Sequence, residues 1–488
     1  MIKPRAIKSL KDVAEFRAYV EKQGIDLACD DEIAVGAASP LVRPIEVYGR
    51  TIGNRWATQP MEGWDGTLAG GATEPMLRRW RRFGESGAKL IWGGEAMAVR
   101  FDGRANPNQL VIGDDTEQDI ARLRDALLAA HRERFGSTDD LLIGFQLTHS
   151  GRYCRPRQGP PEPLVAYRHP ILDRKFKVVS DEQVITDDGV KRLIDDYVRA
   201  AKIARRVGAD FVDIKHCHGY LLHEFLGAKT RQGPYGGTFE NRTRILREIT
   251  AGIRAEVPGL LLGVRVSIFD SIPYKPDPAK SHGPILGPGI PEDFSDCLPY
   301  RYGFGIDESD PTRYDLAEPI RLLELLEELD IRLVNLTAGS PYYNPHIQRP
   351  ALLPPSDGYA PPEDPLAGCA RQINVVKELK ARFPNLVMVG TAYSYLQEYL
   401  PHVAQHYVRE GHVDIVGLGR MLLPYPTFLA DAVAGRPLDD RIICRTLSDC
   451  TTGPRKGLAS GCYPLDDYYT KSEDGALLRK IKREATHG

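Results

Sequence analysis

Lys, His and Tyr side chains that could take part in a reaction gather in one stretch of the chain, between Asp210 and Arg244. An apolar run that begins at Phe211 is followed by Lys215-His216-Cys217-His218-Gly219-Tyr220. A buried strand has this pattern where its carboxyl end opens into a reaction site. Because Lys is a cation and Tyr a weak acid, with His beside them, we expect the chemistry of the chain to lie here.

Composition excludes several other classes of protein. The chain has 488 residues, of which 42% are hydrophobic and 27% are charged, as in ordinary globular proteins. Lys and Arg total 64 against 66 Asp and Glu, so no net field attracts nucleic acid or an acidic membrane surface. No apolar run approaches the length of a membrane span, and no apolar segment follows the basic N-terminus. These features predict a cytoplasmic protein that binds neither nucleic acid nor membrane.

The elements that position the reactive stretch alternate between short apolar runs and helical patterns. Strands alternating with helices predict right-handed crossovers and a parallel sheet, and eight such units fit a closed (β/α)8 TIM barrel. The eight predicted strands are 56–61, 89–95, 141–147, 211–215, 261–266, 333–336, 387–390 and 415–417. The intervening predicted helices include 117–131, 190–207, 241–257, 318–329, 371–382 and 395–409.

Two extensions flank the predicted barrel. Residues 1–42 form an N-terminal extension with an amphipathic helix at 9–23, which a capping-box-like start at Ser9 and Asp12 favours. The barrel occupies 43–437. Residues 438–488 form a C-terminal extension that holds a cluster of cysteines and, after Thr470, a solvated tail. Long loops rich in Pro and Gly, such as 152–163 and 269–302, follow predicted strands and would roof the site.

A phosphate site is predicted at the ends of the last two strands. Val389-Gly390-Thr391 follows the seventh strand, and Gly417-Leu418-Gly419-Arg420 follows the eighth. These loops commonly bind phosphate in such barrels, because Gly exposes backbone N–H groups and Arg supplies a bidentate partner. Two ordinary tight turns are the alternative.

Several motifs together resemble the Old Yellow Enzyme family of FMN-dependent oxidoreductases. That family has a His-x-x-Asn/His-Gly-Tyr-Leu strand end followed by an Arg-Thr-Asp-x-Tyr-Gly-Gly-Ser-x-Glu-Asn-Arg loop. The corresponding segments here are 215–221 and 230–242. Further matches occur in family order: Gln59-Pro60-Met61, Gly94-Glu95-Ala96, Phe145-Gln146-Leu147-Thr148-His149-Ser150-Gly151-Arg152, Val264-Arg265-Val266-Ser267 and Gly417-Leu418-Gly419-Arg420.

The resemblance implies an FMN site and an NADH or NADPH electron donor. Backbone at Pro60 and Ala96 would contact the flavin, Gln146 would hydrogen-bond its pyrimidine ring, and Arg265 would lie near the N1 edge, where negative charge collects on reduction. The implied cofactor-binding residues are Pro60, Met61, Glu62, Ala96, Gln146, Arg265, Gly390, Thr391, Gly419 and Arg420. From sequence alone, Gln146 and Arg265 could equally be satisfied polar residues of the barrel interior.

The resemblance also implies the catalytic residues Lys215, His218 and Tyr220. Lys215 and His218 would hydrogen-bond the substrate's carbonyl oxygen, and Tyr220 would donate a proton. Lys215 replaces the usual His or Tyr and places a cation beside the bound oxyanion. Strict strand alternation would instead put His216 on the same face as His218 and Tyr220. The alternative role of Lys215 is a structural ion pair with Asp213 or Glu95.

Glu62 is a second departure from the family pattern, which often has Thr or Cys at this position to tune the flavin. An ionised carboxylate would oppose formation of an anionic reduced flavin. We therefore expect Glu62 to be protonated, to point away from the flavin, or to accompany an unusual redox potential.

Three cysteines near the C-terminus bear on the choice of subfamily. Cys444, Cys450 and Cys462 resemble the iron–sulfur segment of the trimethylamine dehydrogenase and 2,4-dienoyl-CoA reductase branch, but Leu447 replaces the second cysteine. A four-iron cluster normally needs four thiolates. The three could instead bind zinc with Asp449, or form a packed remnant, which we favour. We expect no counterpart of the C-terminal dinucleotide domain of that branch, so electrons would reach FMN directly or from a redox partner protein.

The expected function is therefore that of an ene-reductase acting on a small-molecule substrate, with a homo-oligomer as the family-level expectation. An amine or C–N dehydrogenase is the nearest enzymatic alternative. A non-catalytic subunit that binds flavin or a phosphorylated ligand, and a flavin-free lyase, are the others.

Overall fold

Eight parallel strands close into a barrel in the computed structural model, which describes residues 4–283, 285–356 and 358–487. The barrel runs in chain order from β3 to β12, and β12 pairs with β3 to close it through Val416 and Trp56. Its strands are β3 (Trp56–Thr58), β4 (Leu90–Ala98), β5 (Leu142–Thr148), β6 (Phe211–Ile214), β7 (Leu261–Ser267), β10 (Leu333–Thr337), β11 (Val387–Gly390) and β12 (Ile415–Leu418). The predicted (β/α)8 fold and its eight strands are confirmed.

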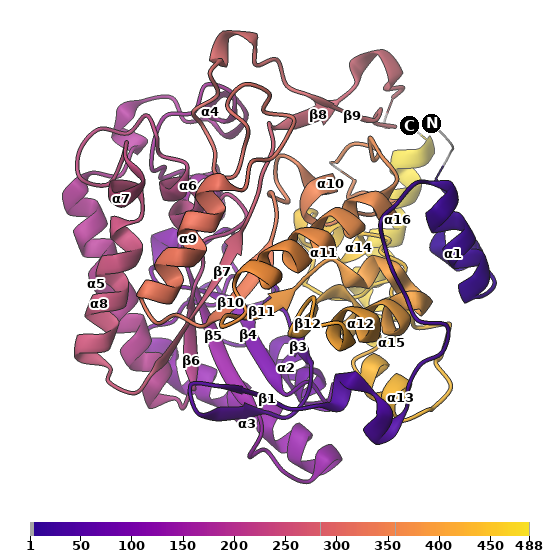
Figure 1. Cartoon of the computed structure of the whole chain (residues 1–488). Coiled ribbons are helices and arrows are strands. Elements are labelled where there is room, and N and C mark those ends of the chain that lie inside the picture. The colour runs from indigo at the N-terminus through magenta and orange to yellow at the C-terminus, as the bar shows by residue number, and fades with distance from the viewer. Residues whose placement is uncertain (1–3, 284, 357, 488) are drawn as a thin grey trace.

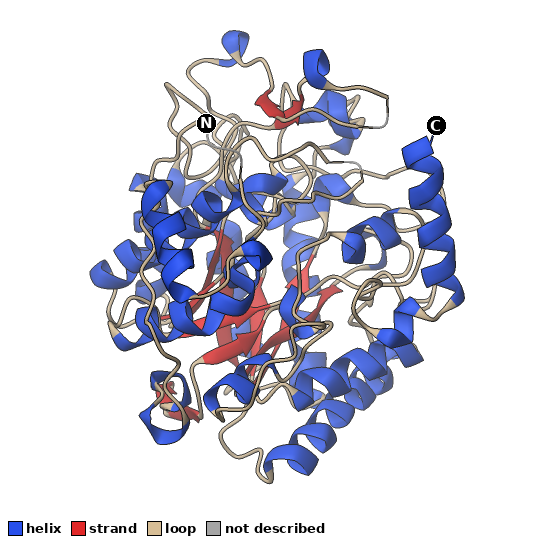
Figure 2. Cartoon of the chain, turned by 90° about the vertical axis from the view of Figure 1, so that its right-hand side faces the viewer, coloured by secondary structure: helices blue, strands red, loops and turns tan. Residues whose placement is uncertain are grey.

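Helices surround the barrel, as Figure 2 shows with the strands at the centre. The apolar strands are covered on both faces, which explains their continuous apolar runs. The longer helices between strands are α2 (Glu74–Glu85), α3 (Glu117–Phe135), α5 (Asp187–Arg206), α8 (Arg244–Glu256), α9 (Ala317–Glu328), α11 (Pro365–Arg382) and α12 (Leu400–Arg409). The shorter ones are α4 (Leu172–Phe176), α6 (Leu221–Leu226), α7 (Phe239–Arg242), α10 (Pro345–Gln348) and α13 (Phe428–Val433). The helix predicted at 241–257 is therefore divided between α7 and α8.

The strand β4 is irregular at the point where it reaches the site. Its pairing with β5 shifts register between Trp92 and Ala96, and the intervening Gly93 and Gly94 have φ of 92° and 53°. A Cβ at Gly94 would lie 2.9 Å from the Trp80 ring, so this position also needs glycine for packing. The bulge lets Glu95 reach a buried ion pair while Ala96 returns to the barrel opening.

The N-terminal extension packs on the barrel's outer helices and floor. Helix α1 (Val13–Lys22) begins after Asp12, whose carboxylate accepts from the Glu15 N–H at 2.8 Å, so the predicted start at Ser9 is wrong by one turn. The α1 side chain Phe16 stacks on Tyr399, with ring centroids 4.4 Å apart. Just after the extension, a hairpin of β1 (Ile45–Val47) and β2 (Arg50–Ile52) buries Val47 and Ile52 against the barrel interior. The floor is thus closed, and access is from the opposite end.

The long loop after β7 carries a small sheet of its own. Strands β8 (Tyr274–Pro276) and β9 (Gly289–Pro291) pair antiparallel and stand at the top of the view in Figure 1. The backbone N–H of Tyr274 donates to the Tyr343 carbonyl at 2.8 Å, which ties this sheet to the loop after β10.

The C-terminal extension folds into helices, and the part after Thr470 that was predicted as a solvated tail is a helix whose described side chains are mostly exposed. The extension contains α14 (Asp449–Arg455), α15 (Asp467–Thr470) and α16 (Glu473–His487). Leu478 of α16 is 2% exposed and packs in a cluster with Leu458, Tyr463 and Tyr469. Arg78 of α2 holds the extension to the barrel through two bonds to Asp466, at 2.8 and 2.9 Å. Apolar residues spaced for one helix face explain why this segment folds back.

None of the described helices combines the length and apolarity needed to cross a membrane.

Candidate active site

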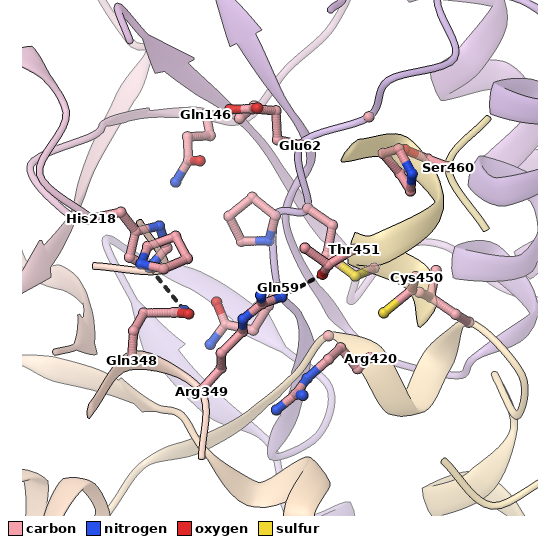
Figure 3. A pocket seen from close by; sticks show the side chains of 18 of the residues that line it. Gln59, Glu62, Gln146, His218, Gln348, Arg349, Arg420, Cys450, Thr451 and Ser460 are labelled. Atoms are coloured by element: carbon pink, nitrogen blue, oxygen red, sulfur yellow. Dashed lines mark hydrogen bonds between the residues drawn. The ribbon is translucent and has the colours of Figure 1, made fainter. Parts of the chain in front are cut away.

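A pocket opens where the barrel strands end, and the C-terminal extension forms its outer wall (Figure 3). Side chains from β3, β4, β5, β6, β7 and β12, or from the loops directly after them, converge there. The predicted residues that line it are Pro60, Met61, Glu62, Ala96, Gln146, Lys215, His218, Tyr220, Arg265, Thr391, Gly419, Arg420 and Cys450. Gly390 lies behind this lining, where its carbonyl accepts from Gln59 Nε2 at 3.4 Å.

The backbone at the end of β6 determines whether Lys215 or His216 faces the same side as His218 and Tyr220. The strand stops at Ile214, and the backbone becomes left-handed at His218 and Gly219, with φ of 67° and 76°. His216 turns into the core, where its Nδ1 lies 2.8 Å from the Ile214 carbonyl. Lys215, His218 and Tyr220 therefore face one pocket, and strict strand alternation is wrong here because the strand has already ended.

His218 is held on both sides of its backbone. Its N–H donates to Ser267 Oγ at 2.9 Å, and its carbonyl accepts from Ser340 Oγ at 2.7 Å. Its Nε2 lies 3.3 Å from Gln348 Nε2, the contact drawn in Figure 3. Burial, with help from the Arg265 and Lys215 cations, lowers the pKa of His218 well below its ordinary value. The ring is therefore neutral, and it can donate one hydrogen bond to a ligand oxygen.

Lys215, Tyr220 and Glu62 form a compact cluster. The Tyr220 hydroxyl donates to the Glu62 carboxylate and lies 2.8 Å from the Tyr342 hydroxyl. Lys215 Nζ lies 3.6 Å from the centroid of the Tyr220 ring, which is a cation–π contact. Burial raises the pKa of Glu62, although the nearby Lys215 opposes this, and burial lowers the pKa of Lys215.

The ion pairs expected as an alternative for Lys215 do not form. Asp213 accepts from the Trp92 indole at 2.7 Å, from Gln146 Nε2 at 2.6 Å and from the Arg265 backbone at 2.7 Å. Glu95 is held by Arg79. With both carboxylates engaged elsewhere, the ammonium group of Lys215 faces the pocket.

Two interior residues have polar atoms that suit the pyrimidine side of a flavin. The bond from Gln146 Nε2 to Asp213 fixes that amide and leaves its carbonyl oxygen for a ligand in the pocket. Arg265 reaches the Pro60 carbonyl through Nη1 at 3.4 Å, while its buried Nε has no hydrogen-bond partner among the described residues. An unpaired buried donor is costly, so Arg265 suits an acceptor that enters the pocket.

The opposite end of the pocket suits a phosphate. Arg420 Nη1 is buried and has no hydrogen-bond partner within the described part of the chain. A Cβ at Gly417 would lie 1.9 Å from Gln59 Nε2, so the loop needs glycine to pass this side chain. Cations at both ends, with Pro60, Met61 and Ala96 between them, fit the charge pattern of FMN.

The sequence did not identify the outer wall of the pocket. Arg349 donates to Thr451 Oγ1, and the Trp64 N–H donates to Ser460 Oγ at 2.8 Å. The unpredicted lining residues include Trp64, Tyr342, Gln348, Arg349, Thr451, Arg455 and Ser460. No local motif marks them, because their positions depend on the C-terminal extension folding back over the barrel.

The three cysteines lie around a small cavity beside this wall, together with Arg420. Burial raises the pKa of Cys444 to about 11 and also raises the pKa of Cys462. Within residues 4–283, 285–356 and 358–487, no group of three or more His, Cys, Asp and Glu side chains is arranged to hold a metal ion.

Comparison with known proteins identifies the family. Residues 40–282 match the model of the NADH:flavin oxidoreductase / NADH oxidase family. The NADH:flavin oxidoreductase FG08077 of Gibberella zeae is 25% identical over 400 residues, which are 78% of this chain and 82% of that protein.

Solved structures show the same fold. The 2-naphthoyl-CoA reductase complex has a TM-score of 0.63 at 18% identity, and the match covers 88% of this chain and 58% of that one. The Old Yellow Enzyme homologue of Zymomonas mobilis has a TM-score of 0.54 at 21% identity, covering 83% of this chain and 95% of the homologue. The chain thus spans little more than half of the first structure and nearly all of the second.

Proposed function

Because the chain belongs to the NADH:flavin oxidoreductase / NADH oxidase family, we propose that it is an FMN-dependent enzyme that reduces activated alkenes. Reduced nicotinamide would be the electron donor, and the alkene would be conjugated to a carbonyl or carboxyl group. The observation that carries this proposal is the convergence of Lys215, His218 and Tyr220 on one pocket.

The charge of the pocket favours an electron-rich oxygen over an amine as the group that is bound. Arg79 pairs with Asp65 and Glu95. Near the proposed flavin and substrate, the pocket is lined by one carboxylate, Glu62, and by the cations Lys215, Arg265 and Arg420. A protonated amine would meet like charge in a site of low dielectric, whereas an enolate-like oxygen would be stabilised there. This supports alkene reduction over the amine dehydrogenase alternative.

Each of these residues would have a separate role in the reaction. FMN, when bound, supplies the hydride that reaches the β-carbon of the substrate. Neutral His218 and the Lys215 ammonium would hydrogen-bond the carbonyl oxygen and stabilise the charge that develops on it. Tyr220 would give its proton to the α-carbon, since a phenol is a stronger acid than the protonated carbon it forms. Gln146, Arg265 and Arg420 would hold the cofactor.

Rapid-mixing experiments on the two half-reactions test this proposal. The FMN-loaded protein is first reduced by NADH or NADPH without oxygen, and is then mixed with an unsaturated ketone, an unsaturated carboxylic acid or a primary amine. We expect either unsaturated compound to reoxidise the flavin. Failure of every activated alkene would refute the proposal, and amine-driven reduction of the oxidised protein would replace it with the dehydrogenase.

A further inference from the structure

Glu62 occupies an unusual position for an acidic residue. It follows β3, lines the same pocket as Lys215 and Tyr220, and lies on the side of Tyr220 that carries its hydroxyl. Figure 3 shows its side chain among those that line the pocket. The function proposed above assigns Glu62 no part in binding or proton transfer.

The hydrogen bonds of Tyr220 restrict where its proton can go. Its hydroxyl oxygen has two hydrogen-bonding neighbours, the Glu62 carboxyl group and the Tyr342 hydroxyl. If Glu62 is a carboxylate, it can only accept, so the Tyr220 proton is directed at Glu62 and not at a substrate. If Glu62 carries a proton, it can donate to the Tyr220 oxygen, and the Tyr220 proton becomes available to the pocket.

The surroundings let Glu62 hold a proton. Burial raises the pKa of its carboxyl group, and this is the largest influence on it. Lys215, Tyr220, Asn106 and Trp64 face it and lower the pKa in turn, the first by charge and the others by hydrogen bonds. Tyr342 completes the group through its contact with Tyr220. Glu62 is therefore set between opposing influences, as a group that must both lose and regain a proton requires.

We propose that Glu62 is the positioning residue that directs the Tyr220 proton toward the substrate and replaces it after transfer, an inference that rests on the proposed alkene reduction. As hydride reaches the β-carbon, the alkene π electrons form a C–H bond at the α-carbon with the Tyr220 proton, and the Tyr220 O–H bond breaks. The Glu62 O–H bond then breaks in turn, its proton restores the Tyr220 hydroxyl, and the resulting carboxylate is reprotonated by solvent water.

A double-mutant cycle on the reoxidation step tests the inference. Tyr220→Phe should slow flavin reoxidation by an unsaturated ketone at least about 100-fold, as expected for loss of a general acid. Glu62→Gln should slow the same step about tenfold, and adding it to Tyr220→Phe should cause no further loss. If the two effects multiply instead, Glu62 does not act through Tyr220 and the proposal is overturned.

The pH dependence distinguishes proton delivery from tuning of the flavin. In the wild type, the reoxidation rate should fall as pH rises and Glu62 loses its proton, and in Glu62→Gln that fall should disappear. The pair of Tyr235 and Glu248, joined at 2.7 Å outside the pocket, provides a matched control. Glu248→Gln should leave the profile unchanged. Glu62→Gln could instead slow flavin reduction and flavin reoxidation equally and leave the pH dependence of reoxidation in place. That result would mean that Glu62 only tunes the redox potential of the flavin.

Infrared difference spectroscopy of a pH titration gives a reading that needs no turnover. Wild-type protein should show a protonated carboxyl band that is missing in Glu62→Gln and shifted in Tyr220→Phe. A band unaffected by Tyr220→Phe would overturn the coupling. If instead the coupling is present but no alkene reoxidises the wild type, the proposed function fails while the Glu62–Tyr220 contact stands.

Discussion

Two clusters of charged side chains lie side by side behind the same loop, and they differ in how completely their hydrogen bonds are satisfied. In the first, Arg79 binds Asp65 at 2.6 and 2.9 Å and Glu95 at 2.9 Å, and Glu95 also accepts from the Gly63 N–H at 2.9 Å. In the second, Lys215 faces the ring of Tyr220 and the partly buried Glu62.

The difference shows how a buried charge can be assigned a role. A guanidinium whose N–H groups are all directed at carboxylates has nothing left for a ligand, so the first cluster holds the loop after β3 in place. The second cluster has hydrogen-bonding capacity left over at the pocket surface. Burial alone is therefore a poor guide to function, and the remaining capacity is a better one.

The largest effect should come from breaking the satisfied cluster. Arg79→Met leaves Asp65 and Glu95 buried without their cation, which should lower the free energy of unfolding by about 3 to 5 kcal/mol. Urea denaturation followed by circular dichroism measures this. A loss below about 1 kcal/mol would mean that the two carboxylates are neutral in the folded protein and that the cluster is not an ion pair.

Tyr220→Phe should have the largest effect on activity with little effect on folding. Reoxidation of the flavin by the alkene should slow at least about 100-fold, because this half-reaction needs the phenolic proton. Reduction of the flavin by NADH or NADPH needs no such proton and should be unchanged. Stopped-flow absorbance separates the two. Tyr235→Phe, which alters a tyrosine outside the pocket, is the control, and equal losses in both half-reactions would contradict the assignment.

Buried histidines outside the pocket should make stability depend on pH. Burial lowers the pKa of His131 to about 4, from about 6.5 when unfolded. Between these values the unfolded chain binds a proton that the folded chain does not, so the free energy of unfolding falls as pH falls. The slope for one histidine approaches about 1.4 kcal/mol per pH unit, and His131→Phe should remove its share.

The control for His131→Phe is the substitution of a histidine on an exposed loop. His282→Gln should leave the pH dependence of stability as it is in the wild type. A slope that His131→Phe does not reduce would mean that other groups cause the acid destabilisation.

Lys215→Met should have the smallest effect, and it should change substrate binding, whereas Arg79→Met changes stability. The half-saturating concentration of an unsaturated carboxylic acid should rise about tenfold, equivalent to about 1.4 kcal/mol, while the free energy of unfolding changes little. Steady-state kinetics and urea denaturation measure the two. Lys229→Met, which removes a lysine paired with Glu308 at 2.7 Å, should leave the kinetics unchanged. Unchanged kinetics in Lys215→Met would remove Lys215 from the site.

The sequence predicted those parts of the site whose residues are neighbours in the chain. The strands were found because burial on both faces leaves continuous apolar runs, and Lys215, His218 and Tyr220 because they follow one such run directly. The outer wall was missed because Arg349 and Thr451 meet only through long-range packing. The helix in the C-terminal tail was not predicted, because its many charged residues outweigh the narrow apolar stripe that includes Leu478.

The outer wall has a consequence for how the protein is made. Thr451 and Ser460 line the same pocket as Gln59 and Glu62, so the site joins early and late parts of the chain. A ribosome releases a protein from its N-terminal end, and the barrel can begin to fold before the last helices emerge. The pocket is then complete only after translation has passed Gly461, the last of the described residues that line it.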